Sequence, residues 1–491
     1  MEPAKDEASA SQAPPSLEEG RHKASPKPQA TITDWDGPDD AGNPQNWGSA
    51  KKIYATMVPA LYAFTVLLGA SVYTPGISQI SSKFDVSRTA AVLGFSLFAE
   101  GLAFGPMIGA PISETFGRRA IYLISLPVSI LFTMATGLAK NFATILVCRF
   151  LAGTFGAPAV AVGAGTIADI WNLQRGAGGL ATILFVLAPF AGSAIGPLIG
   201  GYTIDTRKDW QWLMWVLILV AGPVWLMALV VSETSKKELL RRRAIARGHT
   251  PPPKPPTTAF LKALFVITLF RPLRMLIIEP IVSSLSLYVS FVFGVMFAFF
   301  DAYPYVFQSV YAFSLGQVGL AFVSIVIGFL FAALTSIVIN KTLFEKSRKE
   351  AGPGILPPPE KRLYVSMVGS VGIPVSLFWF AWTAKASIHW IVPILAGIPF
   401  GWGNVCLFLG TTTYLIDTYK AQYSASALAA NGLLRYTFGA IFPLFTFQMY
   451  SRLGIAWAGS LLGFISILLL PIPWVLYKWG SNLRSRSSYK V

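Results

Sequence analysis

The chain has 491 residues, of which 54% are hydrophobic and only 13% are charged, and its formal net charge is +16. Soluble globular proteins carry about 25% charged residues, so this composition, with its many apolar runs of bilayer-spanning length, excludes a soluble globular protein and indicates a polytopic helical membrane protein. The apolar runs are continuous rather than alternating, which excludes a transmembrane β-barrel.

The first part of the chain, 1–50, is polar and rich in Pro, Ser, Lys and Glu. It has no apolar core, so we expect no cleavable signal peptide there. A segment of this composition cannot bury enough apolar surface to fold. We therefore expect a disordered cytoplasmic tail that ends just before Lys51 and Lys52, at the mouth of the first apolar run.

About twelve apolar segments follow, each close to the length that a helix needs to cross a bilayer. Several contain proline, which inside a membrane helix indicates a kink rather than an end. The predicted fold class is all-α membrane, with twelve transmembrane helices in two six-helix bundles. The segments are 53–73, 90–112, 120–138, 142–165, 178–203, 211–231, 274–300, 316–340, 363–384, 389–415, 425–449 and 455–477.

One long polar interruption, 232–272, divides the spans into a first bundle at 51–231 and a second at 273–478, followed by a short tail at 479–491. The interruption begins with a basic cluster and continues with a proline run. We interpret the first part as an amphipathic helix on the inner membrane surface and the second as a semi-rigid spacer.

Lys and Arg are concentrated in alternate loops and in both terminal segments, which places those parts in the cytoplasm. The two bundles then lie parallel, an organisation typical of transporters with a binding site near the bilayer midplane. We expect a plasma-membrane protein with both termini cytoplasmic; a vacuolar membrane is the alternative. Because the Lys and Arg residues lie in cytoplasmic loops, the positive net charge does not indicate a nucleic-acid partner, and none is expected.

Two opposite charges lie inside predicted spans, Glu100 and Arg149. A charge at this depth is costly and is by default a functional candidate. Their depths agree within one helical turn, so we expect the two side chains to meet if their spans border a common cavity. Competition between Arg149 and a proton for Glu100 would couple transport to protons. The alternative is a static pair that only fixes packing.

Five further polar residues lie in the second half. Asp301 is predicted near the outer end of its span, as a surface carboxylate or as a substrate or proton group. Arg435 is predicted near mid-depth, close to Asn431, where it binds an anionic substrate or serves packing. Asn404 and Tyr414 are candidate polar groups of a cavity.

The loop at 110–119 connects the second and third spans. Gly117 suits a tight turn, and Glu114 is expected to cap or neutralise the neighbouring helix end with its arginines, Arg118 and Arg119. The alternative interpretation is an ordinary basic inner turn.

The fifth span contains glycines at four-residue spacing, Gly192, Gly196 and Gly200. This spacing lets two membrane helices approach backbone to backbone. Pro197 removes a helical hydrogen bond and bends the helix, and Gly201 follows the repeat. Generic helix packing is the alternative interpretation.

Taken together, the loop 110–119, Arg149 with Gly153, and Gly196-Pro197 with Gly200-Gly201 resemble the three signature motifs of the major facilitator superfamily. The segments 43–47, 271–272, 302–304 and 425–431 resemble the fungal twelve-span drug:proton antiporters, which include multidrug and polyamine exporters. The resemblance implies that the second and fourth spans border a central cavity. Glu114 departs from the usual Asp of the loop, and Ala110 from its first glycine.

No phosphate-binding Gly-x-x-x-x-Gly-Lys-Ser/Thr loop occurs, and three histidines with two isolated cysteines give no metal site. We therefore expect no cofactor, no metal and no enzymatic activity. The predicted function is proton-coupled export of a small organic molecule, such as a secondary metabolite, an organic acid or a drug, by a monomer in the lipid bilayer. The alternatives are an importer or facilitator of an organic acid or nutrient, and a polyamine exporter.

Overall fold

The computed structural model describes residues 34–172, 176–249, 266–352 and 357–489. Within these ranges the chain consists of helices joined by short connections and contains no strand. The expected all-α class is therefore confirmed. Most of the predicted disordered tail, residues 1–33, lies outside the described residues.

The first half begins with a short turn and contains six long apolar helices. The Ser87 and Asn141 side chains cap two of these helices by accepting backbone N–H groups of their first turns. Gly117, with φ +91°, ends one helix and allows the next to begin at once. The elements are η1 (Pro44–Asn46), α1 (Ser49–Ser71), η2 (Thr74–Gly76), α2 (Ile77–Lys83), α3 (Arg88–Phe116), α4 (Arg118–Gly137), α5 (Phe142–Ile170), α6 (Gly176–Arg207) and α7 (Gln211–Val230).

In the linker, the described residues before 250 form the helix α8 (Lys236–Ala246), and the predicted proline spacer lies outside the described residues. In the second half, Ser314 and Gln317 form a capping box that starts α12. The elements are η3 (Val266–Phe270), α10 (Arg271–Ile278), α11 (Pro280–Tyr311), α12 (Leu315–Ala321), α13 (Val323–Ile339), η4 (Asn340–Phe344), α14 (Glu345–Ala351), η5 (Pro359–Leu363), α15 (Tyr364–Ser370), α16 (Gly372–Thr383), α17 (Ile391–Leu395), α18 (Gly397–Leu469) and α19 (Pro471–Ser485).

Eleven stretches of the described chain are long and apolar enough to cross a membrane. The last of them, Gln422–Ser485, has 64 residues, which is roughly 95 Å of helix and enough for two crossings. Its backbone leaves the helical conformation at Gly454, where φ is +75°, and α18 breaks in the same way at Lys420. The break at Gly454 divides the stretch as expected, and the prediction of twelve spans is confirmed.

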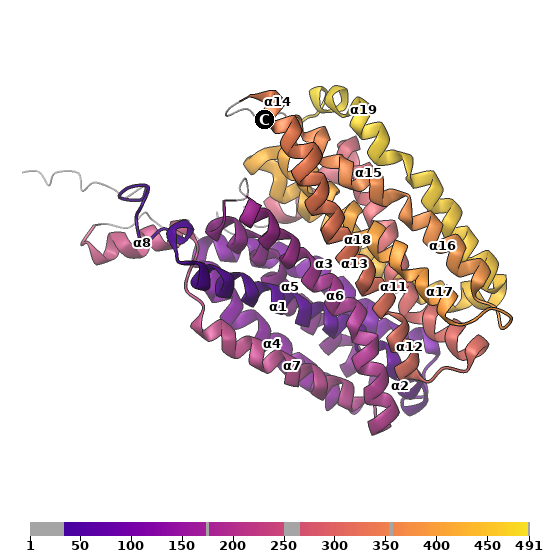
Figure 1. Cartoon of the computed structure of the whole chain (residues 1–491). Coiled ribbons are helices and arrows are strands. Elements are labelled where there is room, and N and C mark those ends of the chain that lie inside the picture. The colour runs from indigo at the N-terminus through magenta and orange to yellow at the C-terminus, as the bar shows by residue number, and fades with distance from the viewer. Residues whose placement is uncertain (1–33, 173–175, 250–265, 353–356, 490–491) are drawn as a thin grey trace, which may run out of the picture.

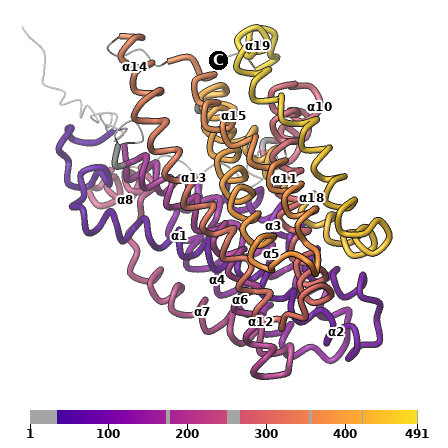
Figure 2. The backbone as a smooth tube through the Cα atoms, turned by 45° about the vertical axis from the view of Figure 1, so that its right-hand side comes forward, coloured from indigo at the N-terminus to yellow at the C-terminus, as the bar shows by residue number. Residues whose placement is uncertain are grey.

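The two halves approach each other at one end of the molecule (Figures 1 and 2). The end where α2 and α12 lie is called the α2 end below, and the opposite end, with α8 and α14, is called the α8 end. Toward the α8 end the indigo-to-magenta helices and the orange-to-yellow helices diverge (Figure 1). At the α2 end, α6 packs directly on α12. The molecule is therefore joined asymmetrically.

Residues 34–48 differ from the expected free tail, because they bind the linker helix. Asp40 pairs with Arg243 through an Oδ2–Nη1 distance of 2.5 Å, and Asp36 pairs with Arg247 at the same distance. The hydrogen bonds from these arginines lower the pKa of Asp40 and of Asp36 below the ordinary carboxyl value. The acidic segment thus neutralises part of the basic face of α8.

The C-terminal segment is also ordered against the second half, up to Tyr489. Glu279, only 1% exposed, accepts hydrogen bonds from the Ser487 hydroxyl at 2.8 Å and from the Ser488 amide at 3.0 Å. Tyr419 donates a third bond to the same carboxylate at 3.0 Å. The segment predicted as a tail at 479–491 is therefore docked as far as the structure describes it.

Candidate functional site

Arg149 is fully buried at the end of α1. Its guanidinium donates to the carbonyl oxygens of Gly69 at 2.8 Å, Ala70 at 3.2 Å and Gly94 at 3.1 Å. Because α1 ends at Ser71, the first two carbonyls belong to its last turn and have no helical partner. Arg149 therefore caps α1 and ties it to α3 and α5, a structural role that favours a cation at the negative end of the helix dipole.

The predicted pair of Glu100 and Arg149 is not formed, and this expectation is wrong. Glu100 instead accepts a hydrogen bond from the Thr437 hydroxyl at 3.3 Å. Arg149 lies over the ring of Phe98, two residues before Glu100 on α3. Two residues correspond to about 200° around a helix, so equal depth in the membrane did not place the two side chains on one face. Glu100 faces the second half of the molecule.

Asp301 is buried rather than at the surface of a helix mouth, since it is 2% exposed. The predicted span ended at residue 300, whereas α11 continues to Tyr311 and places Asp301 well inside the helix. Its carboxylate forms an ion pair with Arg88 at the start of α3. The sequence analysis did not single out Arg88 for this role.

The pair of Arg88 and Asp301 joins the two halves at the α2 end, with further polar contacts beside it. Gln448 donates to the Thr89 hydroxyl at 2.6 Å, and the Gly316 amide donates to Asp205 at 2.8 Å. A cavity of about 340 Å³ is lined by Arg88 together with Thr74, Phe300 and Phe447. Arg88, whose Nε has no hydrogen-bond partner, therefore borders space that water can fill.

Arg435 lies on α18, thirteen residues after Gln422, where the eleventh span begins. Its guanidinium carbon lies 4.9 Å from the ring centre of Phe293, 4.8 Å from that of Phe408 and 4.6 Å from that of Tyr436. Its Nε is buried without a hydrogen-bond partner. Arg435 forms no ion pair with any residue that the structure describes. A cation held only by ring faces retains its capacity to bind an anion.

The other predicted polar groups are not brought into one site. Asn431 donates to the Ser286 hydroxyl at 3.3 Å, and Asn404 points its amide at the sulfur of Met296 at 3.2 Å. Both contacts connect α18 to α11. Tyr414 is buried in a separate apolar cluster near α19. These residues stabilise the second half and do not extend the surroundings of Arg435.

The loop between α3 and α4 is held by two carboxylates, Glu233 and Asp169. Glu233 accepts hydrogen bonds from the backbone amides of Arg118 at 2.8 Å and Arg119 at 3.1 Å, which caps the positive N-terminus of α4. Arg118 also pairs with Asp169 at 3.2 Å. Glu114 is exposed and forms no ion pair within the described ranges, so its expected capping role is wrong.

The second half repeats this arrangement. Arg362, between the eighth and ninth spans, pairs with Asp417 at the end of the tenth span at 2.7 Å. In the first half, the equivalent connection joins Arg118 between the second and third spans to Asp169 at the end of the fourth. Each half is thus tied to itself at the α8 end. Across the two halves, the described residues form no ion pair at this end.

The glycine motif of α6 packs the helix against both of its neighbours. A Cβ atom at Gly192 would overlap the carbonyl group of Phe64, and one at Gly196 would overlap Ser71, both on α1. At Gly201 the overlap would be with the carbonyl of Leu315, across the boundary between the halves. The predicted close approach is therefore present, and Gly201 extends it to the α2 end.

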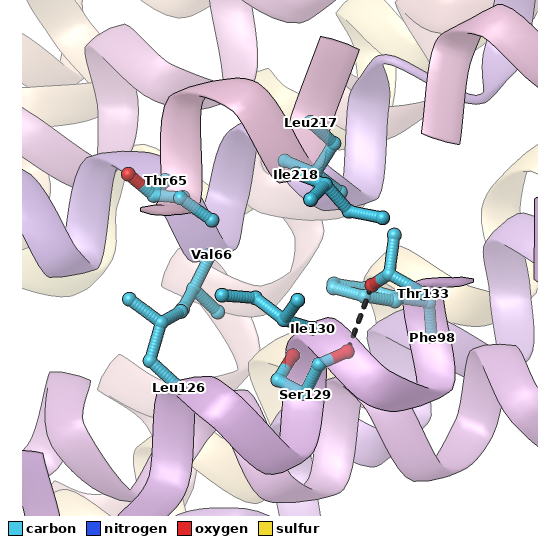
Figure 3. A pocket seen from close by; sticks show the side chains of 11 residues that line it. Thr65, Val66, Phe98, Leu126, Ser129, Ile130, Thr133, Leu217 and Ile218 are labelled. Carbon is cyan, nitrogen blue, oxygen red and sulfur yellow. Dashed lines mark hydrogen bonds between the residues drawn. The ribbon is translucent and has the colours of Figure 1, made fainter. Parts of the chain in front are cut away.

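A small void within the first half does not qualify as a binding site. It has a volume of about 10 Å³, roughly enough for one water molecule. Figure 3 shows its lining, which includes Val66, Ile130 and Leu217, and the hydrogen bond from Thr133 to the Ser129 carbonyl. The position at the centre of one bundle and the size both exclude an organic substrate here.

The family pattern described as Major Facilitator Superfamily matches residues 60–443. "Polyamine transporter 4" of Saccharomyces cerevisiae is 40% identical over 93% of this chain and 73% of the relative. "Major facilitator superfamily multidrug transporter mdrA" of Aspergillus fumigatus is 41% identical over 92% of this chain and 74% of the relative. "Efflux pump radE" of Floropilus chiversii is 36% identical over 94% and 86% respectively.

Among solved structures, a crystal structure of a POT family transporter in complex with 5-aminolevulinic acid is similar. The TM-score is 0.62 with 12% identity, and the likeness covers 90% of this chain and 99% of the other. At this identity the likeness concerns the fold alone.

Proposed function

The chain belongs to the major facilitator superfamily, and on that premise we propose that it exports small organic molecules across a membrane in exchange for protons. Two bundles that rock about a site near the midplane expose that site to one side at a time. The names of the relatives, which include a multidrug transporter and an efflux pump, support export over import. A single copy suffices, because the pathway runs between two halves of one chain.

The observation that carries this proposal is the asymmetry of the contacts between the halves. At the α2 end they are joined by the Arg88–Asp301 pair and by Gln448 with Thr89. At the α8 end the ion pairs between described residues lie within each half. Such a molecule is closed at one end and ready to bind from the other. Opening requires the polar contacts of the α2 end to separate.

The α8 end is the cytoplasmic end in this proposal. Arg118, Arg362 and the basic helix α8 all lie there, and cytoplasmic loops of membrane proteins carry an excess of Lys and Arg. Both terminal segments then lie in the cytoplasm, and the closed α2 end faces outward. The membrane is the plasma membrane in our proposal, with the vacuolar membrane as the alternative.

Glu100 is the carboxylate that we assign to the proton. It lies within α3, faces the second half and binds Thr437 there. An ionised carboxylate between the halves is costly to enclose, and protonation removes that cost. Proton binding to Glu100 would therefore change the relative stability of the two conformations. Arg88 and Asp301 act separately, as an outer gate.

The Glu100→Gln variant tests the proposal, because the amide keeps the contact with Thr437 but binds no proton. We expect it to fold and reach the membrane, and to lose transport driven by an imposed pH gradient. Glu345→Gln, an exposed carboxylate on α14, is the matched control and should transport normally. Undiminished pH-driven transport by Glu100→Gln would remove Glu100 from the mechanism.

Polyamine export is the second candidate, favoured by the relative named for polyamine transport. Polyamines are cations, so this candidate requires a carboxylate as the substrate anchor, and Glu100 is the available one between the halves. Efflux of spermidine that Glu100→Gln abolishes at every pH gradient would favour it. Net uptake of a nutrient by whole cells would instead support the importer alternative.

A further inference from the structure

The rings around Arg435 connect the two halves of the molecule. Phe293 and Phe408, on which the guanidinium lies, both contact Phe190 of α6, with ring centres 6.3 Å and 5.3 Å apart. Phe190 belongs to the first half and the other two belong to the second. Arg435 therefore lies beside the boundary that must open and close during transport, not inside one bundle.

The guanidinium of Arg435 has unused hydrogen-bonding capacity. An arginine carries five N–H donors, and no described residue accepts a hydrogen bond from this one; its Nε is buried and unpaired. The residue as a whole is only partly buried, and its two terminal nitrogens are not among the buried atoms that lack a partner. In a membrane-spanning segment, a charge without a partner is by default a functional candidate.

We infer that Arg435 anchors an anionic group of the transported molecule, so that the substrate class is organic anions with a flat apolar body. This inference rests on the proposed export function. The charged group would form charge-assisted hydrogen bonds to the guanidinium, which suits carboxylates and similar planar anions. The apolar body would lie against the part of Phe408 that remains exposed, since this ring is only partly buried.

The same surroundings disfavour a cationic substrate. Aromatic faces are the groups that hold organic amines in proteins, but the faces of Phe293, Phe408 and Tyr436 are already occupied by the guanidinium. A second cation at this place would also be repelled by Arg435. Arg149 already donates hydrogen bonds to three carbonyl groups. Arg435 is therefore the better placed of the two arginines to bind substrate.

Transport of charge-matched probes tests the inference. The full-length protein is assayed in inside-out vesicles with an acidic lumen, where export is measured as uptake. The probes are benzoate, cinnamate and naphthalene-2-sulfonate, the uncharged amides or sulfonamide of the same three acids, and spermidine. Wild-type protein should take up the anions faster than their amides. Arg435→Gln should lower uptake of the anions about tenfold or more, the effect of losing one charge-assisted contact.

Two variants separate loss of binding from loss of folding. Arg435→Lys keeps the charge but not the planar fork, and should retain part of the anion uptake. Arg207→Gln makes the same chemical change at an exposed arginine that lies on Trp212 at the α2 end, and should transport like the wild type. All three variants are compared by gel filtration before the assay.

The outcomes distinguish failure of this inference from failure of the proposed export function. Uptake of the amides or spermidine in preference to the anions, or equal anion uptake by Arg435→Gln and wild type, overturns the anionic class and leaves proton-coupled export intact. The second result would mean that water alone satisfies Arg435. Absence of any pH-driven uptake by the wild-type protein overturns the export proposal itself.

Discussion

Arg149 and Arg435 are both arginines in the interior of membrane-spanning helices, yet their surroundings differ in kind. Arg149 is completely buried and gives its donors to three carbonyl groups. Arg435 is partly exposed, lies among three aromatic rings and has a buried Nε without an acceptor. The difference teaches that the cost of a buried charge identifies candidates, whereas the hydrogen-bond partners decide between a structural and a functional role.

The largest effect is expected for the stability of the Arg149 variant, and its absence would contradict this comparison. Arg149→Gln leaves up to three buried carbonyl oxygens without their donor, at about 1–3 kcal/mol each, and should lower thermal stability strongly. Arg435→Gln removes no hydrogen bond to a described residue but loses the cation–π contacts, so its stability should fall by about 1–2 kcal/mol, less than that of Arg149→Gln. Melting temperatures of the purified proteins in detergent measure both. Equal losses would show that the two arginines have the same structural role.

An intermediate effect is expected where an arginine binds a carboxylate across the halves. Asp301→Asn removes the charge that holds Arg88 and should shift the equilibrium toward opening at the α2 end by about 1–3 kcal/mol. A cysteine at Thr74, which lines the cavity there and is 8% exposed, should then react faster with a membrane-impermeant maleimide. The native Cys148 and Cys406 are buried and give little background.

The comparison for this labelling experiment is Arg452→Gln, at an exposed arginine of the second half. This variant should leave the labelling rate unchanged. Unaltered labelling in Asp301→Asn would show that the ion pair does not hold the α2 end closed, and apolar packing between α6 and α12 would then be the cause of closure.

The smallest effect is expected outside the membrane-spanning helices, where Arg243 and Arg247 bind Asp40 and Asp36. The pKa of both carboxyls is lowered in the folded protein, so their contribution is complete above about pH 4 and is lost as the pH falls through the lowered values. Added salt should also weaken it. Nitroxide labels at residues 39 and 245 would report separation of the segment from α8.

Replacing Asp36 and Asp40 together by Asn should separate the labels at neutral pH, with little change in the melting temperature. A distance that is the same in this variant and in the wild type would show that the acidic segment is held by its turn rather than by charge.

Features that depend on neighbours in the chain were predictable. Continuous apolar runs gave the twelve spans, because their length against the bilayer is a local property. Gly117 was expected at a tight turn and has φ +91°. The repeat of Gly192 and Gly196 was expected to permit close helix contact, and both glycines lie against α1. The sequence motifs that resemble the family were also predictable, because each lies within one contiguous segment of the chain.

What only the tertiary structure decided is which charged groups meet. Depth along a helix follows from the residue number, but the direction in which a side chain points relative to a distant helix depends on how every helix is rotated in the bundle. Glu100 and Arg149 therefore share a depth and do not touch, while Arg88 and Asp301, 213 residues apart, form an ion pair. Sequence determined that charges lie within the membrane, and packing determined their partners.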